Sequence, residues 1–218
     1  MPPHRRSAAL TVLLAVLVVV AVGYAYGALA AAIPSPDDPD IFWVGNLAAP
    51  FVVLPFLVVS WFARIWGDLR VPLSLVLGGL AGSGLVAGFY GLHRVGRDPN
   101  ADPGEPETIV GSYGRWLSTF VLGRPDGIPW LTIGVIAGAV AGLLAWAWMT
   151  RGSRAAGVAG VSPLLLEPVA RMAAGSRGVP LAGGYPRLPG NLAIWAVEAA
   201  VGVVALWLVL RRGATPRT

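Results

Sequence analysis

The sequence contains no cysteine, no lysine and only two histidines among its 218 residues. Without cysteine there can be no disulfide, thiol catalysis, thiolate-bound zinc or iron–sulfur cluster. His4 lies in the N-terminal tail, so His93 alone cannot hold a haem from two sides. The sequence also lacks a glycine-rich phosphate-binding motif. We therefore expect no cofactor, no metal site and no catalytic residue of a recognisable type.

Charge is also scarce, at 12% of the residues, whereas a soluble domain carries about 25%. Hydrophobic residues make up 56% of the chain, and they gather in runs of about 20 residues, the length that crosses a bilayer as a helix. The lipid bilayer is therefore the expected partner. Despite the net charge of +5, we expect no nucleic acid, because the arginines stand at the ends of apolar runs, where they set membrane orientation.

The apolar runs predict an all-α polytopic transmembrane bundle that forms one integral membrane domain over residues 1–218. The predicted spans are 8–33, 41–66, 71–95, 128–149, 155–174 and 192–210. The first run is longer than the roughly 7–15 apolar residues of a signal peptide, which favours an uncleaved span.

The number of spans depends on the segment 155–174, which is mostly apolar but contains Pro163, Glu167, Pro168 and Arg171. It is a broken span in a six-span topology. In the alternative five-span topology it is a re-entrant segment or a surface helix outside the core. Six spans are favoured because Arg211 and Arg212 directly follow the last run, as at a cytoplasmic end. Both termini are then cytoplasmic. Arginine without lysine, with abundant Ala, Gly, Val and Pro, indicates a bacterial protein of the inner (plasma) membrane.

The segment 96–127 is predicted to be an outer loop that contains an amphipathic helix over 108–122. Apolar residues there recur with a helical period, as in a helix that lies on the outer membrane surface or caps the bundle. Tryptophans are expected near the headgroups at the span ends. Those expected at the inner ends are Trp61, Trp66, Trp146, Trp148 and Trp207, and those at the outer ends are Trp43 and Trp130.

Glycines recur at four-residue spacing within three of the predicted spans, a pattern that lets helix backbones approach closely in lipid. The pattern favours packing within one chain, although a homo-oligomer or another membrane-protein partner stays open. The glycines concerned are Gly23, Gly27, Gly78, Gly82, Gly84, Gly88, Gly134, Gly138 and Gly142.

Ionisable residues within spans are the candidate functional residues, because charges at membrane depth are costly. Glu167 and Glu198 fall at matched depths of about 10 Å below the outer end in the six-span topology. Arg171 shares a helix face with Glu167, and His93 and Arg94 close the outer end of the third span. These five residues predict an outward-facing pocket for a ligand or ion. The alternative is structural, with a Glu167–Arg171 ion pair and Glu198 hydrogen-bonded to a neighbouring helix.

Two of the spans carry a resemblance to known proteins, through Trp130, Gly134, Gly138, Gly142 and Trp146 in one, and Trp195, Glu198 and Gly202 in the other. With this pattern the chain resembles a family of small multipass bacterial membrane proteins of unknown function. The resemblance implies the multipass fold and no particular activity. The long segment Asp98–Gly127 departs from that family's plan.

Three functions are consistent with these features. The first is a non-enzymatic structural or accessory membrane component, favoured by the glycine stripes. The second is a small-solute or ion transporter or channel with a pocket at Glu167, Arg171 and Glu198, since broken helices often frame transport sites. The third is a membrane-embedded enzyme that acts on a lipid-linked substrate.

Overall fold

The computed structural model describes residues 3–32, 49–67, 69–90, 109–123, 129–176 and 192–212, and within these ranges its regular elements are all helices. The expected all-α class is therefore confirmed for the described residues. The helices are α1 (Pro3–Ala32), α3 (Ala49–Trp66), α4 (Val71–Phe89), α5 (Ile109–Leu122), α6 (Trp130–Arg151), α7 (Arg154–Val161), α8 (Pro163–Ser176) and α9 (Leu192–Arg212).

Four helical segments in the described part of the chain are long and apolar enough to cross a membrane. They are Leu10–Ala32 within α1 and the whole of α3, α4 and α6. Exposed side chains on these segments are largely aliphatic, for example Leu17, Val76 and Ile136, which are each more than half exposed. Such a surface is stable in lipid and costly in water, so these helices identify a membrane protein.

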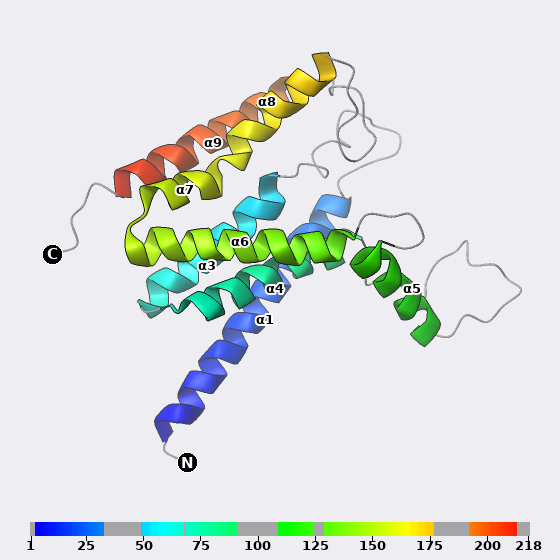
Figure 1. Cartoon of the computed structure of the whole chain (residues 1–218), viewed down its shortest axis with the longest axis vertical. Coiled ribbons are helices and arrows are strands. Elements are labelled where there is room, and N and C mark those ends of the chain that lie inside the picture. The colour runs from blue at the N-terminus through cyan, green and yellow to red at the C-terminus, as the bar shows by residue number, and fades with distance from the viewer. Residues whose placement is uncertain are drawn as a thin grey trace, which may run out of the picture.

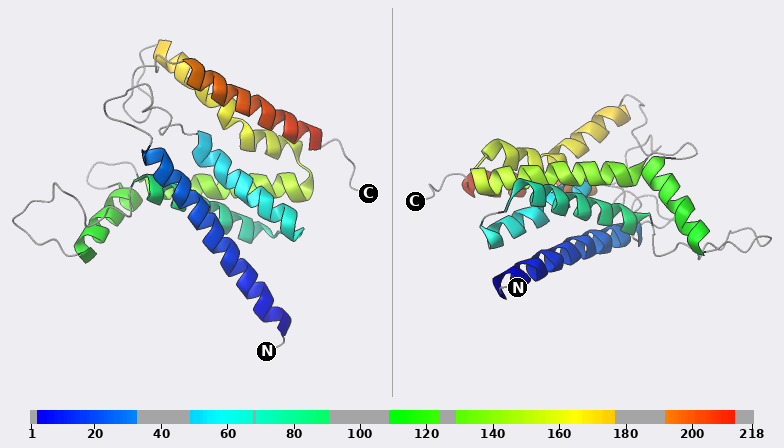
Figure 2. Two further views of the ribbon diagram at one scale, coloured as in Figure 1. Left: turned by 180° about the vertical axis from the view of Figure 1, so that it is seen from behind. Right: turned by 60° about the horizontal axis from the view of Figure 1, so that its bottom comes forward.

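Successive long helices run in opposite directions through the bundle (Figures 1 and 2). α1 and α4 run in one direction, and α3 and α6 run in the opposite direction. α7 and α8 together make the next traverse outward, and α9 brings the chain back. The predicted uncertain segment 155–174 is thus helical but interrupted at Ser162, where a turn is followed directly by Pro163.

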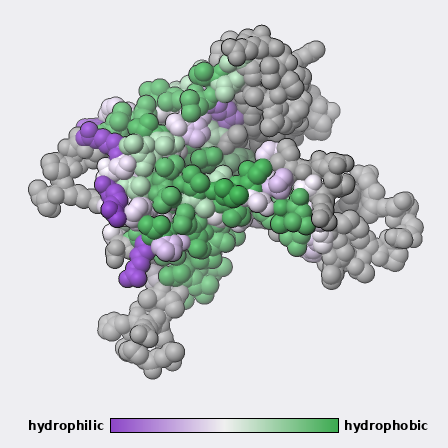
Figure 3. All heavy atoms as spheres, in the orientation of Figure 1, coloured by the Kyte–Doolittle hydropathy of each residue, from purple (hydrophilic) through white to green (hydrophobic). Residues whose placement is uncertain are grey.

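The described arginine side chains mark one end of the bundle, which we call the arginine end. They are exposed, and they are Arg64, Arg70, Arg151, Arg154 and Arg211. Hydrophilic side chains line this edge in Figure 3, while apolar side chains cover the surface beside it. Two of the guanidinium groups lie over tryptophan rings: Arg151 is 5.1 Å from the centre of Trp146, and Arg211 is 4.9 Å from the centre of Trp207. This pairing suits the polar boundary of a membrane.

Glycine contacts hold the central helix α4 between α1 and α6. A Cβ atom added at Gly27 of α1 would overlap the backbone carbonyl of Leu85 in α4, and one at Gly88 would overlap that of Tyr24. On the other face of α4, a Cβ at Gly82 would overlap the carbonyl of Gly134 in α6. The predicted packing role of these glycines within one chain is confirmed, because only a hydrogen atom fits between the backbones.

A second layer, formed by α7, α8 and α9, packs on this core mainly through α3 and the end of α6. The chain reverses sharply after α6 because Gly152 adopts a left-handed conformation with φ of +67°. Ser153 then caps α7, its hydroxyl oxygen accepting a hydrogen bond of 3.3 Å from the Ala156 N–H. Phe56 of α3 is fully buried at the junction and stacks on Trp148 of α6, with ring centroids 5.4 Å apart.

The helix α5 matches the predicted amphipathic segment 108–122 and attaches to the end of the bundle opposite the arginine end (Figure 1). Trp116 of α5 is buried and donates a hydrogen bond of 3.3 Å to the carbonyl of Tyr90. The Tyr90 ring packs on Phe120, with ring centroids 4.5 Å apart, and stacks on Trp130 at 6.3 Å. Burial raises the pKa of Tyr90 to about 12, so its hydroxyl stays protonated at neutral pH. On its other face α5 leaves Leu117 exposed.

The described tryptophans divide between the membrane boundary and the core. Trp61 and Trp207 are each 53% exposed on helix segments near the arginine end, as expected of a headgroup belt. Trp148 departs from that expectation because its ring is buried against Phe56. Position along a helix gives the depth of a residue, but only packing decides whether it faces lipid. Trp43 lies outside the described residues.

Candidate functional site

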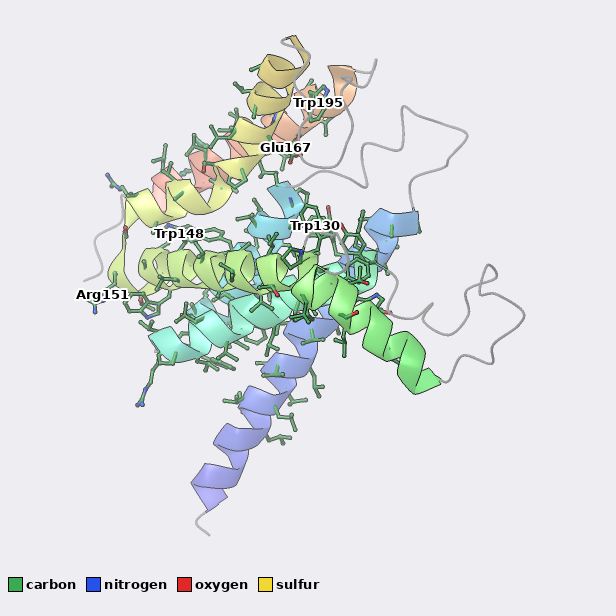
Figure 4. All side chains as sticks on the ribbon, turned by 45° about the vertical axis from the view of Figure 1, so that its right-hand side comes forward. Trp130, Trp148, Arg151, Glu167 and Trp195 are labelled. Carbon is green, nitrogen blue, oxygen red and sulfur yellow. The ribbon has the colours of Figure 1, made fainter. Side chains whose placement is uncertain are left out.

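Glu167 lies on α8 and joins this helix to the N-terminus of α3 (Figure 4). Its Oε2 atom accepts a hydrogen bond of 2.5 Å from the backbone N–H of Ala49, the first residue of α3. The preceding residue is Ala48, which has no side-chain acceptor, and Pro50 has no N–H. A carboxylate from a segment 118 residues away therefore takes the place of a local cap. The negative charge of this carboxylate is also stabilised by the positive end of the α3 dipole.

Glu198 lies on α9 and is only 5% exposed, so protein encloses its carboxylate. Trp195, one turn earlier on the same helix, is 3% exposed (Figure 4). A carboxylate buried this deeply is costly unless neighbouring groups stabilise it. The location makes Glu198 a component of the helix interface rather than of a lipid-facing surface.

Tyr26 of α1 brings the two carboxylates into one neighbourhood. Both Glu167 and Glu198 interact electrostatically with its hydroxyl group. The three side chains therefore lie within electrostatic range of one another, and Glu167 touches the N-terminus of α3, in the half of the bundle away from the arginine end. We call this group (Glu167, Glu198, Tyr26 and the Ala49 N–H) the carboxylate cluster.

The carboxylate cluster contains two of the five residues singled out from the sequence. Glu167 and Glu198 both lie within electrostatic range of Tyr26, while their predicted role as a shared pocket stays a prediction. His93, Arg94 and the side chain of Arg171 lie outside what the structure describes, so the predicted pocket of five residues and the Glu167–Arg171 ion pair stay predictions. Sequence reasoning missed Tyr26 and the Ala49 N–H. Tyr26 could have been noticed in the sequence as a polar ring inside an apolar run. The Ala49 contact joins residues 118 positions apart, and no local sequence pattern indicates it.

Chemically, the cluster offers carboxylate oxygens, a phenol and a helix N-terminus. Among the described residues there is no group of three or more histidine or acidic side chains that could hold a metal ion. One Glu167 oxygen is engaged by α3. The arrangement thus joins α8 to α3 and places one phenol within electrostatic range of two carboxylates.

No family model, curated protein or solved structure matches this chain. The resemblance to the family of small multipass bacterial membrane proteins accordingly stays a prediction.

Proposed function

We propose that this protein is a non-enzymatic structural or accessory component of a bacterial plasma membrane that crosses the bilayer six times. The observation that carries the proposal is the hydrogen bond from the Ala49 N–H to Glu167. It gives a membrane-depth carboxylate a structural task between α8 and α3. The glycine contacts of α4 with α1 and α6 support the same role, because they produce a tightly packed bundle within one chain.

The six-span topology is supported by the direction and surface of the second layer. α7 and α8 together measure about 34 Å at 1.5 Å per residue, enough to cross the roughly 30 Å hydrocarbon core. Leu166 and Val169 on α8, and Val197 and Val203 on α9, are each more than half exposed. Lipid contact would satisfy these side chains. The arginine end then faces the cytoplasm, with both ends of this chain on that side.

Cysteine labelling tests this topology directly, since the natural chain has no cysteine. Single-cysteine variants at Ser7, Ala101, Gly184 and Ala214 can be treated in intact cells with a reagent that does not cross the membrane. Six spans predict labelling at 101 and 184, with 7 and 214 labelled only after lysis. Labelling at 214 and protection at 184 in intact cells would instead establish five spans.

Transport is the second candidate function, favoured by two carboxylates, Glu167 and Glu198, within electrostatic range of Tyr26 beside the interrupted α7–α8 traverse. Such a cluster could bind a proton or small cation on the outer side. The two candidates differ in what the carboxylates do for stability. A structural cap stabilises the fold, whereas a binding site for a charged ligand commonly reduces stability when empty.

The structural proposal therefore predicts that Glu167→Ala lowers the free energy of unfolding by about 1–2 kcal/mol, the usual value of a helix cap. Leu166→Ala is the matched control, because Leu166 is 61% exposed and should change stability by less than about 0.5 kcal/mol. Unfolding can be followed by tryptophan fluorescence during denaturant titration in mixed micelles.

Ion flux supplies the second arm of this test. Proteoliposomes that contain the wild-type chain should pass protons, sodium and potassium no faster than protein-free liposomes. The structural proposal fails if the wild type conducts, Glu198→Gln abolishes that flux while staying folded, and Glu167→Ala is no less stable than the wild type. That combination establishes the transport function.

A further inference from the structure

An apolar groove opens on the surface between α3 and α9, in the half of the bundle that includes the arginine end. Its cavity volume is about 590 Å³, within the usual range of ligand pockets. Its walls include Leu57 of α3 and Val201, Val204 and Leu208 of α9, and each of these side chains is about half exposed. Trp148 of α6 also lines it.

The groove has the length of one membrane leaflet. Along α3 it extends from Phe56 to Arg64, which is about 12 Å at 1.5 Å per residue. Along α9 it extends from Ala200 to Val209, about 14 Å by the same rise. Half of a hydrocarbon core is about 15 Å thick, so one acyl chain lying along the groove would reach from the headgroups to the middle of the bilayer.

Two polar side chains of α3 break the apolar lining. Arg64 is the charged residue of the lining, and its exposed side chain stands at the arginine end. Ser60 lies one turn deeper on the same helix face, about 6 Å along the axis. Ser60 is 6% exposed, and within the described part of the chain its hydroxyl has no hydrogen-bond partner. A buried hydroxyl without a partner is costly, so a bound acceptor would stabilise it.

We propose that this groove binds one anionic phospholipid from the leaflet at the arginine end. The lipid phosphate pairs with Arg64, an ester carbonyl one turn deeper accepts a hydrogen bond from Ser60, and an acyl chain lies between Leu57, Val204 and Leu208. Net negative charge on the headgroup is favoured because Arg151, Arg154 and Arg211 stand on the same edge. The inference rests on the membrane insertion of α9 under the proposed function.

Lipid titration of the purified full chain in detergent tests the proposal. Dioleoyl phosphatidylglycerol should raise the thermal unfolding temperature and appear as one bound lipid in native mass spectrometry, whereas dioleoyl phosphatidylcholine should bind more weakly. Arg64→Gln should weaken phosphatidylglycerol binding about fivefold, the effect of one arginine near a lipid surface. Arg70→Gln is the matched control, since Arg70 is exposed on the same edge but does not line the groove.

A second pair of variants tests the acyl chain. Val204→Trp fills the groove and should abolish the bound lipid, while Val203→Trp, on the neighbouring exposed face of α9, should not. The proposal is overturned if Arg64→Gln and Arg70→Gln weaken binding equally, if the two lipids bind equally well, or if Val204→Trp retains the lipid. The cysteine labelling at 184 and 214 tests the topology of α9 separately, so the two failures are distinguishable.

Discussion

Replacing Gly82 by alanine is expected to separate α4 from α6 and to lower the free energy of unfolding by about 3 kcal/mol, the upper end of overpacking penalties. The added Cβ would overlap the backbone carbonyl of Gly134 and come within 3.2 Å of the Gly138 Cα. A backbone carbonyl cannot rotate away as a side chain can, so the helices must move apart. Denaturant titration in mixed micelles, with size exclusion as a check on folding, measures the effect.

Gly79→Ala is the matched control for this prediction. Gly79 is also buried on α4, but its added Cβ would meet its nearest atom, the Val135 carbonyl oxygen, at 3.4 Å, which is an ordinary contact. Alanine there should be neutral, or should stabilise by up to about 1 kcal/mol because it is the better helix former. Equal effects of the two substitutions would contradict the close approach of α4 and α6 at Gly82.

Truncating Phe56 to alanine is expected to cost about 3–5 kcal/mol, as for other buried phenylalanines. The Phe56 ring is fully buried, stacks on Trp148 at 5.4 Å and fills the space that a Cβ at Gly160 of α7 would need. It therefore joins α3, α6 and α7, and its loss leaves a cavity where the two layers meet. The same mixed-micelle titration should show a lower unfolding midpoint.

The neighbouring Leu57 supplies the control, because its side chain is 49% exposed and points away from that junction. Leu57→Ala should change the free energy of unfolding by no more than about 0.5 kcal/mol. A large effect at Leu57 together with a small one at Phe56 would show that α3 is rotated about its axis relative to the described packing.

Together these contacts describe two kinds of helix joint in one chain. α4 is held to α1 and α6 by glycine faces, where backbone meets backbone. The second layer is held to α3 by the Phe56 ring, which packs on Gly160 of α7, and by one carboxylate at a helix N-terminus. In lipid the hydrophobic effect does not drive helices together, so both joints depend on close packing and on satisfied polar groups.

The extent of each helix followed largely from composition. The predicted runs 71–95, 128–149 and 192–210 overlap α4, α6 and α9, because an apolar stretch in lipid can satisfy its backbone groups only within a helix. The break expected within 155–174 occurs at Ser162, because Pro163 lacks the N–H that would continue the pattern. Glycine spacing likewise indicated which faces pack, since it is a property of one helix.

Only the tertiary structure decided which helices meet through these faces and what the polar groups do there. The partner of Glu167 is a backbone N–H 118 residues away, and no local pattern records such a contact. The same holds for Tyr26 beside the two carboxylates, and for Trp148, which is buried although its position along α6 placed it near the headgroups. The sequence by itself determined that these helices are suited to lipid and how long they are, because both properties depend on local hydrophobicity. Their contacts depend on how separate helices dock, which is a property of the whole bundle.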